Sequence, residues 1–103
     1  MFALFVRFGV KEGCEERFDA LVAETINGIA AHEPDTLVYL TSVPASEAGV
    51  RVFLEVYRDQ DAFDRHEQQS HVRAFLNARR ALVDSVTVDR LTDVSGHVAG
   101  PQS

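Results

Sequence analysis

The sequence predicts an α+β sandwich, in which helices cover one face of an antiparallel sheet of four strands. Four segments are rich in β-forming residues and alternate in side-chain character, as strands do. Other stretches repeat apolar residues every three or four positions, as helices do. Their order along the chain is strand, helix, strand, strand, helix pair, strand. That order is the βαββαβ pattern of a ferredoxin-like fold.

The first strand is expected over residues 2–8 and the first helix over residues 14–32. Alternation places Phe2, Leu4, Val6 and Phe8 on one face of the strand, and Ala3, Phe5 and Arg7 on the other. Both faces are largely apolar, which predicts that the strand is covered on both sides. The helix has acidic residues in its first turn, which suits the positive end of its dipole.

Two further strands are expected over residues 36–43 and 50–57, joined by a polar hairpin loop. In the third strand Val50, Val52, Leu54 and Val56 share one face, and Arg51, Phe53, Glu55 and Tyr57 share the other. The pattern ends with a short helix capped by Asp59 or Asp61, a second helix from His71 to about Ala81 capped by Ser70, and a strand over residues 84–91.

The 103 residues suit one domain, expected over residues 1–94, with residues 95–103 as a flexible tail that contains glycine and proline. Helices cover only one face of the predicted sheet, yet apolar side chains occupy both faces. A second copy of the chain laid against the open face would cover it, so we expect a homodimer. The interface is expected to bury Phe5, Phe53 or Tyr57.

Composition and charge disfavour several classes of function. The net charge of −6 argues against nucleic acid or an anionic membrane as a partner, because both require a basic surface. No apolar run is long enough to span a membrane and the first residues lack the basic head of a signal peptide, so a cytoplasmic protein is expected. The single cysteine, Cys14, excludes a disulfide framework and a cysteine-based zinc site. No glycine-rich nucleotide loop occurs, so neither NAD nor ATP is indicated, while flavin stays open.

Three segments resemble one known family. Residues 10–21, VKEGCEERFDAL, are similar to the strand–turn–helix opening of the antibiotic biosynthesis monooxygenase domain. Residues 53–59, FLEVYRD, resemble its third-strand motif, and residues 66–72, HEQQSHV, resemble its helix junction. The resemblance covers residues 2–92 in the family's order of elements. It implies a dimeric α+β barrel with a pocket between sheet and helices in each subunit.

Members of that family include cofactor-free monooxygenases of quinols or polyketide phenols, haem-degrading enzymes, and an isomerase of a signalling sugar phosphate. The haem-degrading members place an Asn on the first strand and a Trp on the helix after the third strand. This sequence has no Trp, has His66 where that Trp would stand and has Val6 near the Asn, so haem degradation is not expected. The resemblance therefore implies a cofactor-independent monooxygenase that oxidises a quinol-like or polyketide phenol with O₂.

His66 is the candidate catalytic residue, because an imidazole can accept a phenol proton near neutral pH. The alternative is that His66 is a half-exposed helix residue that only packs on Phe63. Phe63 lies three positions earlier on the same helix, so His66 faces the sheet if Phe63 does. Residues expected to contact the substrate are Val6, Phe63, His71, Phe75 and Leu76. For His71, near the start of its helix, a solvated position is the favoured interpretation.

Glu55, Arg7 and Tyr57 are candidates for polar support of the site. Glu55 lies between two aromatic residues on a strand, and two interpretations are open. It is either a buried general base with a raised pKa or one half of an ion pair with an arginine such as Arg7 or Arg51, across the sheet or across the dimer, and the ion pair is favoured. Arg79 is a further candidate to stabilise a phenolate. Tyr39 and Tyr57 could donate to a substrate oxygen, but core packing is favoured for both.

No metal site is expected, because His66, His71 and Glu67 are poorly spaced across a break between helices. Two other functions stay open at this point. One is an isomerase or lyase that uses the same pocket with His66 as a proton shuttle. The other is a non-enzymatic dimeric module that binds a ligand in that pocket.

Overall fold

The structure is a computed structural model that describes residues 1–100 of the chain. Within these residues, four strands, three α-helices and one short 3₁₀ helix follow one another in the predicted order. The strands are β1 (Phe2–Val10), β2 (Thr36–Ser42), β3 (Val50–Tyr57) and β4 (Val83–Leu91). The helices are α1 (Glu15–His32), α2 (Gln60–Gln68), α3 (Ser70–Ala78) and the 3₁₀ helix η1 (Arg79–Ala81).

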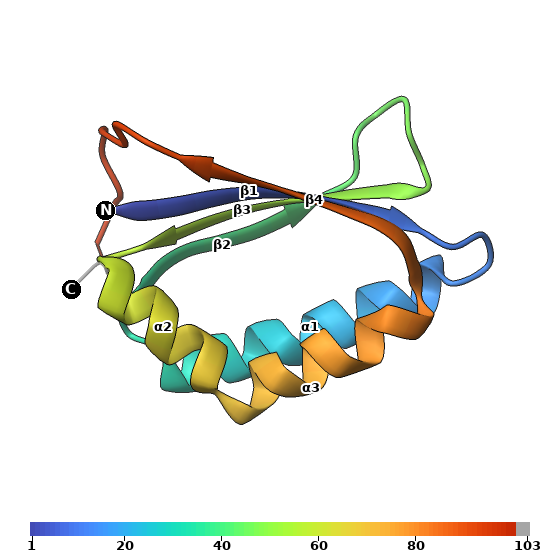
Figure 1. The fold of residues 1–103 in the computed structure, drawn as a ribbon, viewed down its shortest axis with the longest axis horizontal. Coiled ribbons are helices and arrows are strands. Elements are labelled where there is room, and N and C mark those ends of the chain that lie inside the picture. Colours follow the sequence, from blue (N-terminus) through green and yellow to red (C-terminus); the bar gives the residue numbers. More distant parts are fainter. Residues whose placement is uncertain (101–103) are drawn as a thin grey trace.

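The four strands form one antiparallel sheet, and the three α-helices all lie against the same face of it (Figure 1). The strand order across the sheet is β2-β3-β1-β4, so β3 and β1 are the central strands. This is the ferredoxin-like βαββαβ arrangement, and the predicted α+β class is confirmed. We call the face against the helices the inner face and the opposite one the outer face.

The core lies between the inner face and the helices, and it is mainly aromatic. Alternate residues of β1, from Phe2 to Val10, point toward the helices and are buried. Phe8 packs on Phe18 of α1, with ring centroids 5.3 Å apart, and on Phe53 of β3, with centroids 4.8 Å apart. Because each buried aromatic side chain removes roughly 150–250 Å² from water, this cluster is a main source of stability between the two layers.

The outer face carries apolar side chains in rows that cross the strands. One row contains Leu40, Leu54 and Phe5, which pair on neighbouring strands and are 61%, 36% and 38% exposed. Phe53 and Tyr57 lie instead on the inner face and are 1% and 0% exposed. The expectation that either residue lies at a dimer interface is therefore wrong. Strand alternation on β3 points these two side chains toward the helices of their own chain.

In the helix pair after β3, one of the two predicted caps of the first helix is found and the predicted cap of the second is not. The Asp59 carboxylate accepts a hydrogen bond from the backbone N–H of Ala62 at 2.8 Å, so Asp59 and not Asp61 caps α2. Ser70 is the first residue of α3 rather than its cap. The second helix ends at Ala78, and the chain continues in the tighter turn of η1.

The expected C-terminal tail, residues 95–103, lies partly outside the described residues, which end at residue 100. Residues 92–100 form neither helix nor strand. Among the helices of residues 1–100, none combines the length and the apolar character needed to cross a membrane.

Candidate active site

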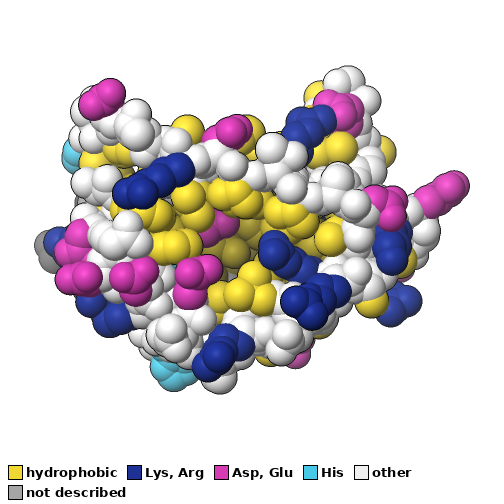
Figure 2. All heavy atoms as spheres, in the orientation of Figure 1, with side chains coloured by type: hydrophobic (Ala, Val, Ile, Leu, Met, Phe, Trp, Pro, Cys, Tyr) yellow, Lys and Arg dark blue, Asp and Glu magenta, His cyan; other side chains and the backbone are white. Residues whose placement is uncertain are grey.

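A cavity of about 160 Å³ lies between the inner face of the sheet and the helices α2 and α3. Figure 2 shows hydrophobic side chains gathered in a hollow between these two layers. A cavity of about 150 Å³ is enough to bind benzene, so this volume suits one aromatic ring. The lining residues are Leu4, Val6, Phe8, Tyr39, Glu55, Phe63, His66, Glu67, Val72, Phe75, Leu76, Arg79 and Val88.

His66 borders this cavity from α2. Its side chain follows Phe63 by three positions, so both leave the helix on the side of the sheet, and His66 is only 5% exposed. The imidazole centroid lies 5.0 Å from that of Tyr57 and 5.7 Å from that of Tyr39. These aromatic neighbours shield the imidazole from bulk water.

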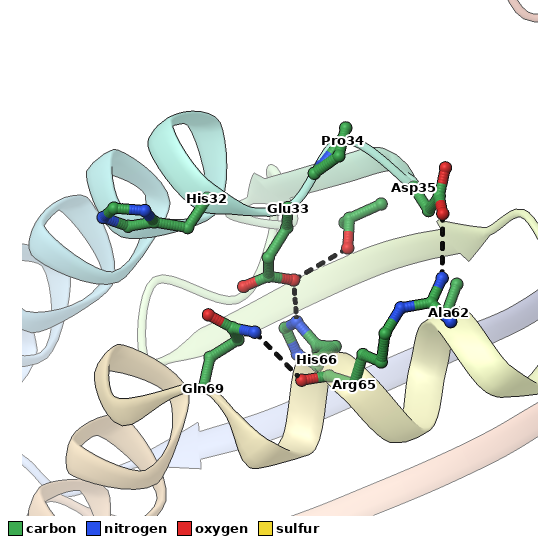
Figure 3. A pocket seen from close by; sticks show the side chains of 9 residues that line it. His32, Glu33, Pro34, Asp35, Ala62, Arg65, His66 and Gln69 are labelled. Atoms are coloured by element: carbon green, nitrogen blue, oxygen red, sulfur yellow. Dashed lines mark hydrogen bonds and ion pairs between the residues drawn. The ribbon is translucent and has the colours of Figure 1, made fainter.

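The Glu33 carboxylate, directly after α1, binds the Nδ1 edge of the His66 ring (Figure 3). Glu33 Oε1 accepts hydrogen bonds from His66 Nδ1 at 2.6 Å and from the Thr36 hydroxyl at 2.8 Å. Glu33 Oε2 accepts a hydrogen bond from His71 Nε2 at 2.5 Å. The Glu33 side chain is 4% exposed, so a single buried carboxylate joins imidazoles from α2 and α3.

The charge state of Glu33 fixes where the imidazole hydrogens lie. Burial alone raises the pKa of Glu33, but hydrogen bonds from His66, Thr36 and His71 outweigh it, and the pKa lies below its usual value. An ionised carboxylate only accepts hydrogen bonds, so His66 Nδ1 and His71 Nε2 each carry a hydrogen. In a neutral His66 the lone pair is therefore on Nε2.

The Nε2 atom of His66 makes no hydrogen bond within residues 1–100. Every fully buried polar side-chain atom in that part of the chain has a partner, so Nε2 must keep contact with solvent. Since the ring borders the cavity and Nδ1 is occupied by Glu33, Nε2 is the nitrogen that a molecule in the cavity can reach.

Glu55 is the second buried carboxyl of the site and lies on the cavity wall from β3. It is 6% exposed and accepts one hydrogen bond, from the Tyr57 hydroxyl at 2.5 Å. Burial raises the pKa of Glu55, and the Tyr57 hydrogen bond and the His66 and Arg79 charges offset this only in part. Burial, followed by the charge of Glu55, also raises the pKa of Tyr39 and of Tyr57, so both phenols keep their protons.

A β-bulge at the start of β2 lets two of its residues serve the site. The pairing register shifts just after Thr36, so Thr36 pairs with Tyr57 and Tyr39 pairs with Glu55. Both partners lie on the inner face. Thr36 therefore bonds Glu33 while Tyr39 lines the cavity. Strict alternation would have put these two side chains, three positions apart, on opposite faces.

Opposite charges flank the cavity. Glu67 lines it from α2 and Arg79 lines it from η1, and Figure 2 shows acidic and basic side chains on either side of the hollow. The Arg79 guanidinium lies over the rings of Phe8 and Phe75, 5.3 and 5.9 Å from their centroids. Arg79 belongs to none of the ion pairs among residues 1–100. It is therefore a cation available to an anionic ligand.

The cavity brings together most of the residues that the sequence placed around it. Val6, Phe63, Phe75 and Leu76 line it together with His66. The first comes from β1, the second from α2 and the last two from α3. Their roles in binding a substrate stay predictions.

Arg7 and His71 do not lie where they were expected. Arg7 alternates with Val6 along β1, so it is on the outer face, pairs with Glu47 and cannot reach the cavity. His71 does not line the cavity either. It is also not solvated, since its side chain is 15% exposed and bonded to Glu33.

The favoured ion pair of Glu55 with an arginine does not occur in the described part of the chain. Arg51 pairs instead with Asp19 of α1 at 2.7 Å, and Arg7 faces outward. Tyr57 supplies the only hydrogen bond to Glu55 within these residues. The raised pKa of Glu55 therefore agrees with the other interpretation, that of a buried acid–base group.

Glu33 is the site residue that sequence reasoning missed. The sequence shows it only as the residue between α1 and Pro34. One local signal was available, because a carboxylate at a helix C-terminus opposes the helix dipole and needs compensation. The compensation comes from His66 and His71, which follow 33 and 38 residues later, and no local pattern links positions so far apart.

His66 and His71 both hydrogen-bond Glu33 and not Glu67. The three residues considered as metal ligands from the sequence therefore do not come together. Residues 1–100 contain no group of three or more His, Cys, Asp or Glu side chains arranged to hold a metal ion. The geometry around Glu33 is instead that of a hydrogen-bonded acid–base array.

A family model and several solved structures match the chain. The model described as antibiotic biosynthesis monooxygenase matches residues 1–78, the part from β1 to the end of α3. A comparison with curated proteins finds no match.

Three solved structures illustrate the structural similarity. One from Bacteroides thetaiotaomicron VPI-5482, assigned to the antibiotic biosynthesis monooxygenases, has a TM-score of 0.87 at 18% identity, over 97% of this chain and 95% of that one. One from Caulobacter crescentus CB15, with the same assignment, has a TM-score of 0.85 at 22% identity, over 91% and 90%. One from Lactobacillus acidophilus NCFM, assigned to the monooxygenases, has a TM-score of 0.84 at 22% identity, over 88% of this chain but 43% of that one. At these identities the similarity shows the fold alone.

Proposed function

Because this chain belongs to the antibiotic biosynthesis monooxygenase family, we propose that it is a cofactor-independent monooxygenase that oxidises a quinol-like or polyketide phenol with O₂. The observation that carries the proposal is the buried imidazole of His66, held at Nδ1 by Glu33 while its ring borders an aromatic cavity. Such an imidazole offers one lone pair, in a place where bulk water is largely excluded.

In this reaction the substrate supplies the electrons. His66 Nε2 accepts the phenol proton, and the phenolate gives one electron to O₂, which forms a phenoxyl radical and superoxide. The two radicals combine at a ring carbon that bears hydrogen, and the peroxide then loses water to leave a quinone. One phenol and one O₂ become one quinone and one water, so no external reductant is required.

Neighbouring side chains match the charges that develop. Arg79 is a cation on the cavity wall and would stabilise the phenolate and the superoxide. Tyr39 keeps its proton and can donate a hydrogen bond to an oxygen of the substrate. Glu55, with its raised pKa, can deliver a proton to the departing peroxide oxygen.

Oxygen uptake with a panel of one-ring and fused-ring phenols and hydroquinones tests the proposal. We expect His66→Ala to lower turnover by about 10²–10⁴-fold, because it removes the acid–base group. His97→Ala, at an exposed position after β4, is the matched control and should leave turnover unchanged. Unchanged turnover in His66→Ala would reject the role of His66, and no uptake with any member of the panel would reject the oxidation of phenols.

The family resemblance implies a dimer, and we infer that this chain pairs through its outer face. The row formed by Leu40, Leu54 and Phe5 supports this, because its apolar side chains lie at least a third exposed on the face that no helix covers. Sedimentation should show a species of twice the 11.4 kDa chain mass. Leu54→Glu should shift it toward the monomer, whereas Val98→Glu, an exposed valine outside the sheet, should not. A wild-type protein that sediments only at the mass of a single chain would contradict the dimer.

One observation also favours an isomerase that acts in the same cavity. His66 as a base and Glu55 as an acid both line it, and enolisation requires such a pair. Exchange of the α-hydrogens of an enolisable ketone with deuterated water would detect this activity. Exchange without oxygen uptake would favour the isomerase over the monooxygenase.

A further inference from the structure

We propose that Glu33 is the positioning residue of the site: it holds His66 as the Nδ1–H tautomer with Nε2 toward the cavity, and His71, seated on Gly28, holds Glu33 in turn. This assignment rests on the proposed role of His66 as the base. It adds a chain of contacts that runs from α1, through α3, to the reacting nitrogen.

Glu33 is held by side chains from several elements. Its two oxygens accept three hydrogen bonds, from His66, His71 and Thr36, and its side chain is 4% exposed. None of these donors lies on α1, which Glu33 follows directly. The carboxylate is thus fixed from three other places in the chain: β2, α2 and α3.

His66 lies between two hollows. Glu33, Asp35, Arg65 and Gln69 border a second, smaller hollow between α2 and the turn that follows α1 (Figure 3). His66 is the one residue that lines both this hollow and the cavity. One edge of its ring is therefore anchored at Glu33, and the other is left for a ligand.

Several polar side chains other than Glu33 surround the His66 ring. Tyr39, Tyr57 and Glu55 face it from the sheet, and Glu67 follows it on α2. Within residues 1–100 none of these groups hydrogen-bonds either ring nitrogen. Glu33 alone therefore determines which nitrogen carries the hydrogen.

A glycine of α1 allows His71 to reach Glu33. The His71 ring lies directly against Gly28 of α1, and a Cβ atom at position 28 would be 2.5 Å from its Cγ. Glycine in the middle of a helix is unfavourable, so its presence at this contact has a packing reason. Gly28 leaves the space in which the His71 ring turns its Nε2 to Glu33.

Imidazole tautomers provide a test that needs no substrate. Long-range proton–nitrogen spectra of the nitrogen-15-labelled protein at about pH 8, where an ordinary imidazole is neutral, distinguish Nδ1–H from Nε2–H. We expect His66 to be Nδ1–H in the wild type and in Glu33→Gln, whose amide oxygen still accepts the hydrogen bond. Glu33→Leu has no acceptor and should lose this preference. A wild-type His66 in the Nε2–H form, or an unchanged tautomer in Glu33→Leu, would overturn the proposal.

Substitution at Gly28 tests the link through His71. Gly28→Ala should displace the His71 ring and reduce the Nδ1–H population of His66. Gly49→Ala is the matched control, because a Cβ there meets only the Val10 carbonyl oxygen at 4.0 Å. Unchanged His66 resonances in Gly28→Ala would overturn the part of the proposal that concerns His71.

Kinetics with a turned-over phenol separate positioning from mere folding. Glu33→Gln keeps the tautomer but lacks the charge that stabilises the imidazolium, so kcat should fall about 10–100-fold while KM changes by less than about twofold. An unchanged kcat would overturn the electrostatic part of the proposal. If the wild type oxidises no phenol, the proposed function fails, whereas the tautomer result still decides the role of Glu33.

Discussion

Glu33 and Glu55 are both buried carboxyls beside His66, but their surroundings differ in the number of hydrogen-bond donors. Glu33 accepts hydrogen bonds from two imidazoles and a hydroxyl, and these lower its pKa despite burial. Glu55 accepts one hydrogen bond from a phenol, and burial raises its pKa. The pKa values of two residues of the same type are thereby shifted in opposite directions.

The difference shows that burial alone does not set the charge of a carboxyl group. Burial acts on both groups in the same direction, and the donors decide the outcome. Pairs of titratable groups whose pKa values are pushed apart are typical of acid–base sites. The contrast therefore supports a site in which Glu33 serves His66 and Glu55 faces the substrate.

The largest expected effect is a difference between the two carboxyls in their contribution to the free energy of unfolding. Glu33→Gln replaces an acceptor of three hydrogen bonds with an amide that can accept at one oxygen only, so it should lower the free energy of unfolding by about 1.5–3 kcal/mol at neutral pH. Glu55→Gln keeps an acceptor for Tyr57 and removes a group that is costly to ionise, so it should change that free energy by less than about 1 kcal/mol. Urea unfolding measures both. Equal losses in the two variants would contradict the contrast.

The second effect is the pH dependence of stability. The folded-state pKa of Glu33 is below 4.5, so its contribution is present above pH 4.5 and is lost as the pH falls through the lowered value. The folded-state pKa of Glu55 is above 4.5, so its contribution is present below pH 4.5 and is lost as the pH rises through the raised value. Each group changes stability by at most about 1.4 kcal/mol per pH unit.

The difference in unfolding free energy between the wild type and each variant, measured against pH, isolates the contributions of Glu33 and Glu55. The deficit of Glu33→Gln should shrink as the pH falls below 4.5, because Glu33 takes up a proton there in the unfolded wild type but only at lower pH in the folded one. Glu55→Gln should become more stable relative to the wild type as the pH rises above 4.5. A Glu55→Gln curve that runs parallel to the wild type would show that the pKa of Glu55 is not raised.

The smallest effect concerns the one donor to Glu55. Tyr57→Phe removes a hydrogen bond that lowers the pKa of Glu55, so that pKa should rise further and unfolding should become easier by about 1 kcal/mol. Tyr39→Phe is the matched control, because the Tyr39 hydroxyl makes no hydrogen bond within residues 1–100 and does not touch the Glu55 bond. A larger shift of the Glu55 pKa in Tyr39→Phe than in Tyr57→Phe would contradict this arrangement.

Periodicity predicted the layers and the position of His66, because both depend on residues close together in the sequence. Phe63 and His66 share a helix face, and Val6 shares a strand face with the core of β1, so their neighbourhood followed from spacing. The same alternation placed Arg7 opposite Val6. The prediction that Arg7 supports the site therefore conflicted with the strand alternation that the sequence already showed.

Other features of the site depend on contacts that no local pattern contains. Glu33 meets His66 and His71 only after α1, α2 and α3 pack together, so its role was not visible in the sequence. The bulge after Thr36 interrupts the alternation that would otherwise place Tyr39. Long-range partners and register shifts are properties of the packed molecule, and these account for what the sequence did not reveal.

Direct titration of the two carboxyl groups tests the central claim, that hydrogen-bond donors lower the pKa of Glu33 while burial raises the pKa of Glu55. Carbon-13 spectra of protein labelled at the glutamate side-chain carboxyl carbon, assigned with Glu33→Gln and Glu55→Gln, report each group separately. We expect the Glu33 signal to titrate below the ordinary glutamate value of 4.5 and the Glu55 signal to titrate above it. Two carboxyls that titrate together, or in the reverse order, would contradict the account.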